Sequence, residues 1–245
     1  MVLSTEQGVS RQFAPVGARC STHGVQRAIE PELMQDRQQA LAYARADFSE
    51  PNAAFLHSAE WVLTGLGPNS KVVDLGCGPA DIPIRLALAH PEWQLDALDG
   101  SPAMIALARE AASCAGVSRR LHLHCARLQH SPLPSFAYDA VLSNSLLHHL
   151  HEPQLLWQQV VRLGRPGASV IVADLRRPGD EETARRIVSH YSGNEPPILK
   201  RDFFRSLLAA FTVPEVRLQL DQAGLVELKV EPTDDRHLLV SGRLR

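Results

Sequence analysis

The sequence predicts an α/β protein with a mostly parallel sheet and helices on both faces. From Lys71 onward, short apolar runs alternate with helical patterns, which is typical of successive βαβ units. The last two predicted strands, 225–231 and 237–244, are too close in sequence for a crossover helix between them. We therefore expect one antiparallel strand near the C-terminus.

Composition is ordinary for a globular protein of 245 residues, with 44% hydrophobic and 21% charged residues. The net charge of -2 supplies no overall basic field for nucleic-acid binding. No apolar run reaches the roughly 18 residues of a membrane span. The four cysteines, Cys20, Cys77, Cys114 and Cys125, form no CxxC pair, so we expect reduced thiols, no metal site and a cytoplasmic location.

The N-terminal region divides into a tail and a helical cap. Residues 1–29 show no clean periodicity and no apolar stretch of a secretory signal, so a flexible tail is expected, with a transit peptide as the alternative. Residues 30–68 are expected to form the cap. Its two helices are predicted at 36–47, which is rich in helix formers, and at 51–64, which begins with proline.

The central part of the chain supplies most of the sheet. We expect its strands at residues 72–75, 94–99, 121–125, 138–143 and 168–174. We expect its helices at residues 81–90, 102–115 and 153–163.

An insertion at 180–211 follows the fifth strand and is long for a strand-to-helix connection. It should contain helices at 181–191 and 201–211, the second burying Phe203, Phe204, Leu207 and Leu208. The run from Thr212 to Glu215 then predicts a capping box, and the helix that it begins should end at Gly224.

The turn after the first predicted strand carries the strongest functional signal. Gly76 and Gly78 permit a sharp turn and a close approach of a ligand to the backbone. Asp99 ends the next strand about 20 residues further on, where an acid can accept both hydroxyls of a ribose. This pairing indicates a nucleoside site.

Acidic residues around the turn indicate which nucleoside fits. Asp81 stands where the third glycine of a dinucleotide motif would be, and its carboxylate would repel a pyrophosphate. Asp74 adds a second acid before the turn. A nucleoside with no phosphate and two cationic centres suits this negative environment better.

At residues 73–81 together with Asp99, the chain resembles the class I S-adenosylmethionine-dependent methyltransferases. Residues 138–150 resemble the fourth-strand motif of that family, and 162–167 resemble its later R-x-L-x-P-G-G turn. The resemblance is closest to the quinone-biosynthesis and small-molecule group. It implies a Rossmann-like seven-stranded sheet, a methyltransferase domain over 69–245 and S-adenosylmethionine as cofactor.

The resemblance also implies roles for individual residues. Asp74, Gly76 and Gly78 would border the methionine moiety, and Asp99 would hold the ribose. The adenine would lie near Gly100, Ser101 and Met104 and against the backbone of Ala126 and Arg127. Ser143 and Asn144 end the fourth strand, where they are placed to touch the methionine end.

Candidate catalytic and substrate-binding residues follow the fourth and fifth strands. His148 or His149 could act as a base, and because neighbours on a helical turn point about 100° apart, at most one should face the site. Asp174 could be a base or a hydrogen-bond acceptor, and Arg176 or Arg177 could clamp an anion. The other candidate substrate contacts are Tyr43, in the cap, and Phe203, in the insertion that would roof the pocket.

These observations favour methyl transfer to a small-molecule partner, and leave alternatives. A methyltransferase acting on RNA or protein is one, although no N-P-P-Y/F tetrapeptide is present, residues 143–146 being Ser-Asn-Ser-Leu. A nicotinamide-dependent oxidoreductase is disfavoured by Asp81, as above. A non-catalytic nucleoside-binding module has the same motif. The acceptor atom and the oligomeric state stay open.

Overall fold

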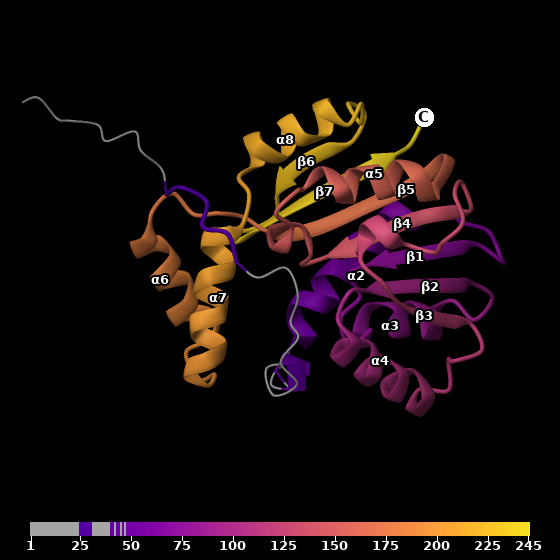
Figure 1. The fold of residues 1–245 in the computed structure, drawn as a ribbon, viewed down its shortest axis with the longest axis horizontal. Coiled ribbons are helices and arrows are strands. Elements are labelled where there is room, and N and C mark those ends of the chain that lie inside the picture. Colours follow the sequence, from indigo (N-terminus) through magenta and orange to yellow (C-terminus); the bar gives the residue numbers. More distant parts are fainter. Residues whose placement is uncertain (1–24, 31–39, 42, 45, 47) are drawn as a thin grey trace, which may run out of the picture.

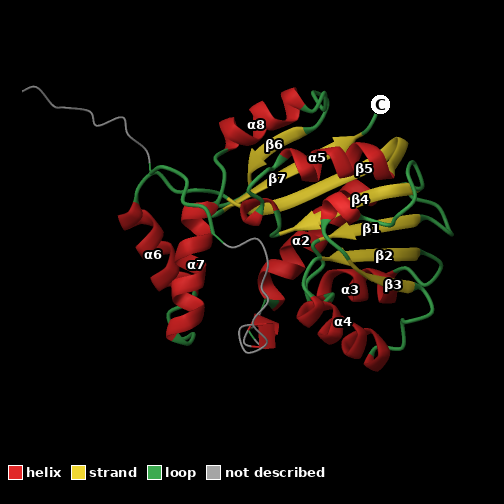
Figure 2. Cartoon of the chain, in the orientation of Figure 1, coloured by secondary structure: helices red, strands yellow, loops and turns green. Residues whose placement is uncertain are grey.

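The structure is a computed structural model that describes residues 25–30, 40–41, 43–44, 46 and 48–245. Seven strands in this part of the chain form one sheet in the order β3-β2-β1-β4-β5-β7-β6. Strand β7 runs antiparallel to both of its neighbours, and the other strand pairs are parallel (Figures 1 and 2). The predicted fold class is therefore confirmed.

The strands keep the predicted order with two changes of bounds. They are β1 (Lys71–Leu75), β2 (Gln94–Asp99), β3 (Leu121–Cys125), β4 (Tyr138–Asn144), β5 (Gly164–Leu175), β6 (Lys229–Pro232) and β7 (His237–Arg243). Strand β5 begins earlier than predicted because Gly164 already pairs with Tyr138 across an irregularity in the register. Strand β6 begins later because the amide of Leu228 donates to the carbonyl of Leu225 in a turn.

Seven helices with defined bounds accompany this sheet in the described part of the chain. They are α2 (Ser49–Leu63), α3 (Asp81–Ala89), α4 (Pro102–Cys114), α5 (Gln154–Leu163), α6 (Glu181–Tyr191), α7 (Pro197–Ala209) and α8 (Val213–Gln222). Helix α7 begins earlier than predicted because Pro197 suits a first helical turn. The predicted capping box of α8 is confirmed, since Thr212 and Glu215 each accept a backbone N–H of the other. Of the helix predicted at 36–47, only residues 40, 41, 43 and 44 are described as helical.

The helices form a layer on each face of the sheet. Helices α5 and α8 pack on one face, and α2, α3 and α4 pack on the other (Figure 1). Alternate residues of a strand point to opposite faces, so Val73 of β1 contributes to the first core cluster and Val72 to the second. The carboxyl ends of the parallel strands are left uncovered by these layers.

Helices α6 and α7 of the insertion lie beyond that edge of the sheet (Figure 1). They share a separate small core with Leu175, the last residue of β5. Leu207 is fully buried there, whereas Phe203, Phe204 and Leu208 are half-buried, so the predicted burial holds in full for Leu207 alone. The insertion thus stands where it can border a site at the strand ends.

Residues 25–30, called the N-terminal strap below, pack across the same edge. The amide of Val25 donates to Gly179, and that of Ala28 donates to Leu208. The Arg27 guanidinium donates to the carbonyls of Ala209 (2.6 Å), His148 and Leu150 (both 2.9 Å), and stacks 4.0 Å from the Phe211 ring centre. The predicted tail is therefore wrong for residues 25–29, while residues 1–24 lie outside the described part.

Two further findings concern the described residues only. No helix among them is long and apolar enough to cross a bilayer. Cys77, Cys114 and Cys125 are free thiols, and Cys20 lies outside the described residues.

Candidate functional site

The turn between β1 and α3 is shaped by residues in the left-handed region. A Cβ on Gly76 (φ +77°) would lie 2.8 Å from Cδ1 of Leu146, so the protein's own packing requires glycine there. Gly78 (φ +52°) instead faces open space, where a ligand can approach the backbone. Ala80 also has a left-handed φ of 69° although it carries a Cβ. The turn therefore holds strain beside a surface that is open to a ligand.

Asp99 connects this turn to the end of β2. Its Oδ2 accepts the amide of Gly78 at 2.9 Å, and its Oδ1 accepts the amide of Ser101 at 2.7 Å. Burial raises the pKa of Asp99, and these hydrogen bonds partly oppose the shift. Each carboxylate oxygen keeps a further lone pair. Asp99 can therefore hold the turn and still accept two ligand hydroxyls.

Asp74 at the end of β1 is buried without a matching partner. Its side chain is 3% exposed, and no described group hydrogen-bonds to its Oδ1. Burial, and then the charge of Asp99, raise the pKa of Asp74 to about 7. A buried carboxylate with an unpaired oxygen is costly by itself and is satisfied by a cationic donor.

The remaining predicted cofactor residues lie around these two acids. Ser101 caps α4, its hydroxyl accepting the amide of Met104 at 3.3 Å. Gly100 is half-buried between Asp99 and Ser101. The amide of Ala126 donates to the carbonyl of Asp99 at 3.0 Å, which brings the end of β3 alongside β2.

Three further predicted residues differ in their exposure to solvent. Arg127 is exposed, and Asn144 is half-buried at the end of β4. Ser143 is fully buried, and its hydroxyl donates to the carbonyl of Leu75 at 2.8 Å. The predicted contact of the Ser143 side chain with the methionine end is corrected, because this side chain ties β4 to β1.

Two residues after β4 were missed from the sequence. Ser145 has a left-handed φ of 57°, and its amide donates to the carbonyl of Ala173 at 2.9 Å. This bend carries Leu146 over Gly76. A serine gives little sign of a left-handed conformation in a sequence, so only the tertiary structure reveals the bend.

The β1–α3 turn, Asp74 and Asp99 are called the cofactor crevice below, and His148 and Asp174 form a short buried pair at the same edge of the sheet. Nδ1 of His148, in the 3-10 turn η2 (Leu147–His149), lies 2.5 Å from Oδ1 of Asp174 at the end of β5. Asp174 also accepts the amides of Leu175 (2.6 Å) and His148 (3.3 Å). Although burial opposes both charges, the pairing raises the pKa of His148 and lowers that of Asp174.

Glu30 of the N-terminal strap joins this pair. Its Oε1 lies 3.0 Å from Nδ1 of His149 and 3.6 Å from Nε2 of His148, and it accepts the hydroxyl of Ser206 at 3.1 Å. Although burial opposes it, the pKa of Glu30 is lowered, chiefly by His149. Glu30, His148, His149 and Asp174 are called the histidine–carboxylate cluster below.

Tyr43 links the described part of the predicted cap to both regions. Its ring lies 4.6 Å from that of Phe48. Burial raises the pKa of Tyr43 to about 12, and the carboxylates of Asp99 and Asp174 add to the shift. The charges of both regions therefore act on the phenol of Tyr43.

The two arginines of the predicted clamp have different surroundings. Arg177 donates to the carbonyl of Ala210 at 2.7 Å and to the Glu215 carboxylate at 2.6 Å. Arg176 donates to the carbonyl of Asp234 at 3.0 Å in the loop before β7. The Arg177 guanidinium therefore joins parts of the protein to each other, whereas the buried Nε of Arg176 has no hydrogen-bond partner among the described residues.

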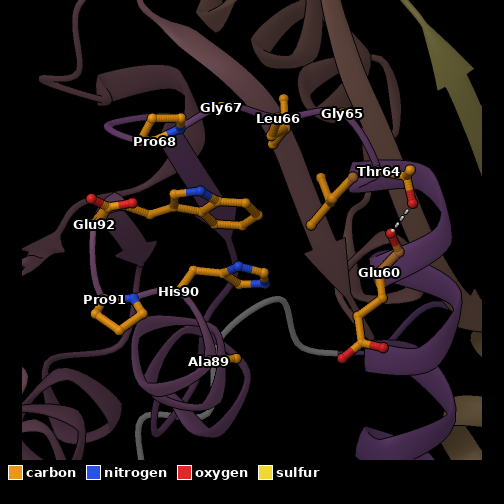
Figure 3. A pocket seen from close by; sticks show the side chains of 12 residues that line it. Glu60, Thr64, Gly65, Leu66, Gly67, Pro68, Ala89, His90, Pro91 and Glu92 are labelled. Carbon is orange, nitrogen blue, oxygen red and sulfur yellow. Dashed lines mark hydrogen bonds between the residues drawn. The ribbon is translucent and has the colours of Figure 1, made fainter.

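A surface hollow of about 470 Å³ lies elsewhere on the molecule (Figure 3). Residues 63–68 after α2 and 89–93 after α3 line most of it, and the His90 and Trp93 rings stack within it at 3.7 Å. It therefore lies near the amino ends of β1 and β2. Ligands of open α/β sheets bind at the opposite, carboxyl ends, so the acids mark the better candidate site.

Comparison with known proteins finds methyltransferases that are similar to parts of this chain. Residues 72–167 match the methyltransferase-domain family. An arsenite methyltransferase of Halobacterium salinarum is 23% identical over 73% of this chain and 43% of its own length. A trans-aconitate 2-methyltransferase of Methylobacterium nodulans is 32% identical over 56% of this chain and 49% of its own. The chain thus spans about half the length of these relatives or less.

Solved structures share the whole architecture. A methyltransferase from Aquifex aeolicus that depends on S-adenosylmethionine (SAM) covers 86% of this chain and 99% of its own, with a TM-score of 0.63 and 18% identity. Phosphoethanolamine N-methyltransferase 2 of Haemonchus contortus in complex with SAM covers 81% and 44%, with a TM-score of 0.61 and 15% identity. Over residues 72–167 the chain therefore matches a methyltransferase domain, and its fold is that of SAM-dependent methyltransferases.

The crevice of this methyltransferase domain fits its cofactor. SAM carries an ammonium and a sulfonium but no phosphate, and the crevice offers two acids. Asp74 has a buried oxygen without a partner, Asp99 has lone pairs for the ribose, and Gly78 leaves open space. The unpaired Asp74 oxygen in particular is what a cationic ligand would satisfy.

Proposed function

We propose that this methyltransferase transfers the methyl group of SAM to a small-molecule acceptor. The observation that carries the proposal is the pair of acids at the ends of β1 and β2, one of which has a buried oxygen without a partner. The segments around the proposed acceptor site favour a small substrate. Four separate segments converge there: the N-terminal strap, η2, the end of β5 and α7. Such convergence leaves less room for a polymer.

Each acid has a distinct binding role in this proposal. Asp74 pairs with the ammonium of the methionine moiety, and Asp99 accepts the ribose hydroxyls while keeping the turn in place. SAM supplies an electrophilic methyl group when bound. Holding an acceptor in line with that group provides several kcal/mol of the catalysis.

In this proposal the histidine–carboxylate cluster takes up the proton that the acceptor loses. We retain His148, His149 and Asp174 as the proposed catalytic residues. His148 is 3% exposed and held by Asp174, which makes it a positioning residue, whereas His149 is half-buried and shifts the pKa of Asp99. His149 is thus the more exposed of the two histidines, and the one that a hydroxyl or thiol acceptor would meet in the metal-free protein.

The acceptor in this proposal is neutral or apolar. Arg177 is held by Ala210 and Glu215, and Arg176 donates to Asp234 in the loop before β7 while its Nε has no described partner. Half-buried Phe203 on α7 and Tyr43 of the cap offer apolar surface instead. This agrees with the resemblance to the quinone-biosynthesis and small-molecule group, which we keep as part of the proposal.

The proposed organisation has three parts in addition to residues 1–24. Residues 30–68 act as a cap, 69–245 form the methyltransferase domain, and the insertion at 180–211 roofs the acceptor side. The hydrogen bond from Ser206 of α7 to Glu30 supports the roof, because it connects the insertion to the histidine–carboxylate cluster.

The test is transfer of radiolabelled methyl groups from SAM to a cell extract that has been separated by molecular size. We expect label in the small-molecule fraction, and much less with Asp99→Ala protein at the same subsaturating SAM concentration. Label in RNA or protein instead would overturn the choice of acceptor. SAM binding with no label in any fraction would indicate a non-catalytic binding module.

A further inference from the structure

We propose that Glu30, His148 and His149 form a binding site for a divalent transition-metal ion of the zinc type. A carboxylate oxygen and two imidazole nitrogens are ligands that such ions prefer. In this structure the three ligand atoms lie within 4.8 Å of one another. Two histidines and one glutamate make a three-ligand set that leaves one coordination position open.

The separations are those that a metal ion can bridge with small movements. Ligands about 2.1 Å from a tetrahedral zinc ion lie about 3.4 Å apart. Oε1 of Glu30 lies 3.0 Å from Nδ1 of His149 and 3.6 Å from Nε2 of His148, which brackets that value. The two imidazole rings lie side by side, with centres 4.1 Å apart. Small rotations of these side chains therefore complete the site.

Asp174 provides the outer contact that metal-binding histidines commonly have. Its Oδ1 lies 2.5 Å from Nδ1 of His148 and accepts a hydrogen bond from the N–H at that position. The lone pair of His148 is then on Nε2, the nitrogen that faces Glu30. A carboxylate that fixes the tautomer and orientation of a histidine in this way raises its basicity as a ligand.

The surrounding charges favour a cation. Glu30 and Asp174 bring two carboxylates to the cluster, and Arg27 brings one guanidinium that donates to the carbonyl of His148. Arg177 nearby is already paired with Glu215. Two negative charges against one unpaired positive charge leave a net attraction for a divalent ion.

The ligands come from distant parts of the chain, so no sequence motif indicates the site. Glu30 belongs to the N-terminal strap, and the two histidines follow β4. A bound ion would join the strap to η2 directly. The expectation of no metal rested on the scattered cysteines, and these are not the proposed ligands.

Titration with Co²⁺ tests the site, because cobalt bound by nitrogen and oxygen ligands absorbs visible light. The full chain, freed of metal with a chelator, should bind one Co²⁺ with a visible absorption band, and added Zn²⁺ should displace it. Glu30→Gln and His149→Ala should each abolish the band. Asp174→Asn should weaken binding by about 10–100-fold.

His151→Ala is the matched control. His151 lies on the same loop, and its ring contacts the carbonyl of Glu30 rather than the side chain, at 2.9 Å. This variant should keep the band and the affinity. Circular dichroism and SAM binding show that each variant is folded. The proposal is overturned if folded wild-type chain binds no stoichiometric Co²⁺, if Glu30→Gln and His149→Ala keep the band, or if His151→Ala loses it as they do.

Discussion

The cofactor crevice and the histidine–carboxylate cluster each contain a buried aspartate at a strand end, and the two acids behave in opposite ways. Asp74 is 3% exposed and Asp174 is 2% exposed. Yet the pKa of Asp74 is raised to about 7, whereas that of Asp174 is lowered. Burial is common to both, so the partners decide the outcome.

The difference is that Asp174 is fully paired within the protein and Asp74 is not. Asp174 accepts hydrogen bonds from the imidazole of His148 and from two backbone amides. Asp74 has an oxygen with no partner in the described structure and a second acid, Asp99, nearby. The cluster therefore stabilises its own charge, and the crevice is arranged to be completed by a cationic ligand.

The largest expected effect comes from breaking the buried pair of Asp174 and His148. Asp174→Asn should lower the free energy of unfolding by about 3–5 kcal/mol at pH 7, because it removes one partner of a buried charged pair. The lowered pKa of Asp174 means that its contribution is present above the unfolded value and is lost as pH falls through the folded value. Urea unfolding measures this, and a loss under 1 kcal/mol would contradict the pairing.

Asp74→Asn should act in the reverse sense on stability. The raised pKa favours the protonated folded state, so ionisation of Asp74 destabilises the cofactor-free protein as pH rises from its unfolded value through about 7. At pH 8 the variant should therefore be the more stable protein. It should also bind SAM about 3 kcal/mol more weakly, since the ammonium loses its buried partner. Urea unfolding measures the stability and calorimetric titration the SAM affinity. A variant that is no more stable than wild type at pH 8, or that binds SAM equally well, would contradict this prediction.

Asp99→Ala should weaken SAM binding by about 1.5–3 kcal/mol, the range for hydrogen bonds to a charged group. Part of this loss comes from the turn, because Asp99 also accepts the amide of Gly78. Asp99→Asn separates the two causes, since its carbonyl can still accept one of these hydrogen bonds. Unchanged affinity in Asp99→Ala by calorimetry would remove Asp99 from the ribose site.

The sequence predicted the crevice better than the cluster for a physical reason. Asp74, Gly78 and Asp99 follow consecutive strands, and parallel strands bring their ends to one edge. Glu30 reaches the cluster only through the path of the N-terminal strap, which no local pattern encodes. Arg177 was expected at the opening, but its guanidinium is held by Glu215 and Ala210 instead.

The fold was predictable for the same reason, and its errors were local. Apolar runs predicted the succession of strands and helices along the chain, while the bounds of β5 and β6 depended on an irregular register and a turn. The left-handed Ser145 and Ala80 were beyond sequence reasoning, because neither residue type prefers that conformation.

Ala80→Gly should give the smallest effect and should leave both acids as they are. Glycine relieves the left-handed strain at φ 69° but adds freedom to the unfolded chain, so a net gain of about 0.5–1 kcal/mol in unfolding free energy is expected. SAM affinity should not change. Thermal or urea unfolding measures the gain, and a loss of stability would show that packing of the Ala80 methyl outweighs the strain.

The pH dependence of SAM binding tests the central claim most directly. If the Asp74 carboxylate, with a pKa of about 7 in the free protein, must be ionised to pair with the ammonium, calorimetric affinity should rise by about fivefold or more from pH 6.0 to 7.5. Asp74→Asn protein should bind weakly at both values, with that rise absent. Saturable binding by the wild-type chain that is equally tight at both pH values, or equally tight in Asp74→Asn, would contradict the account.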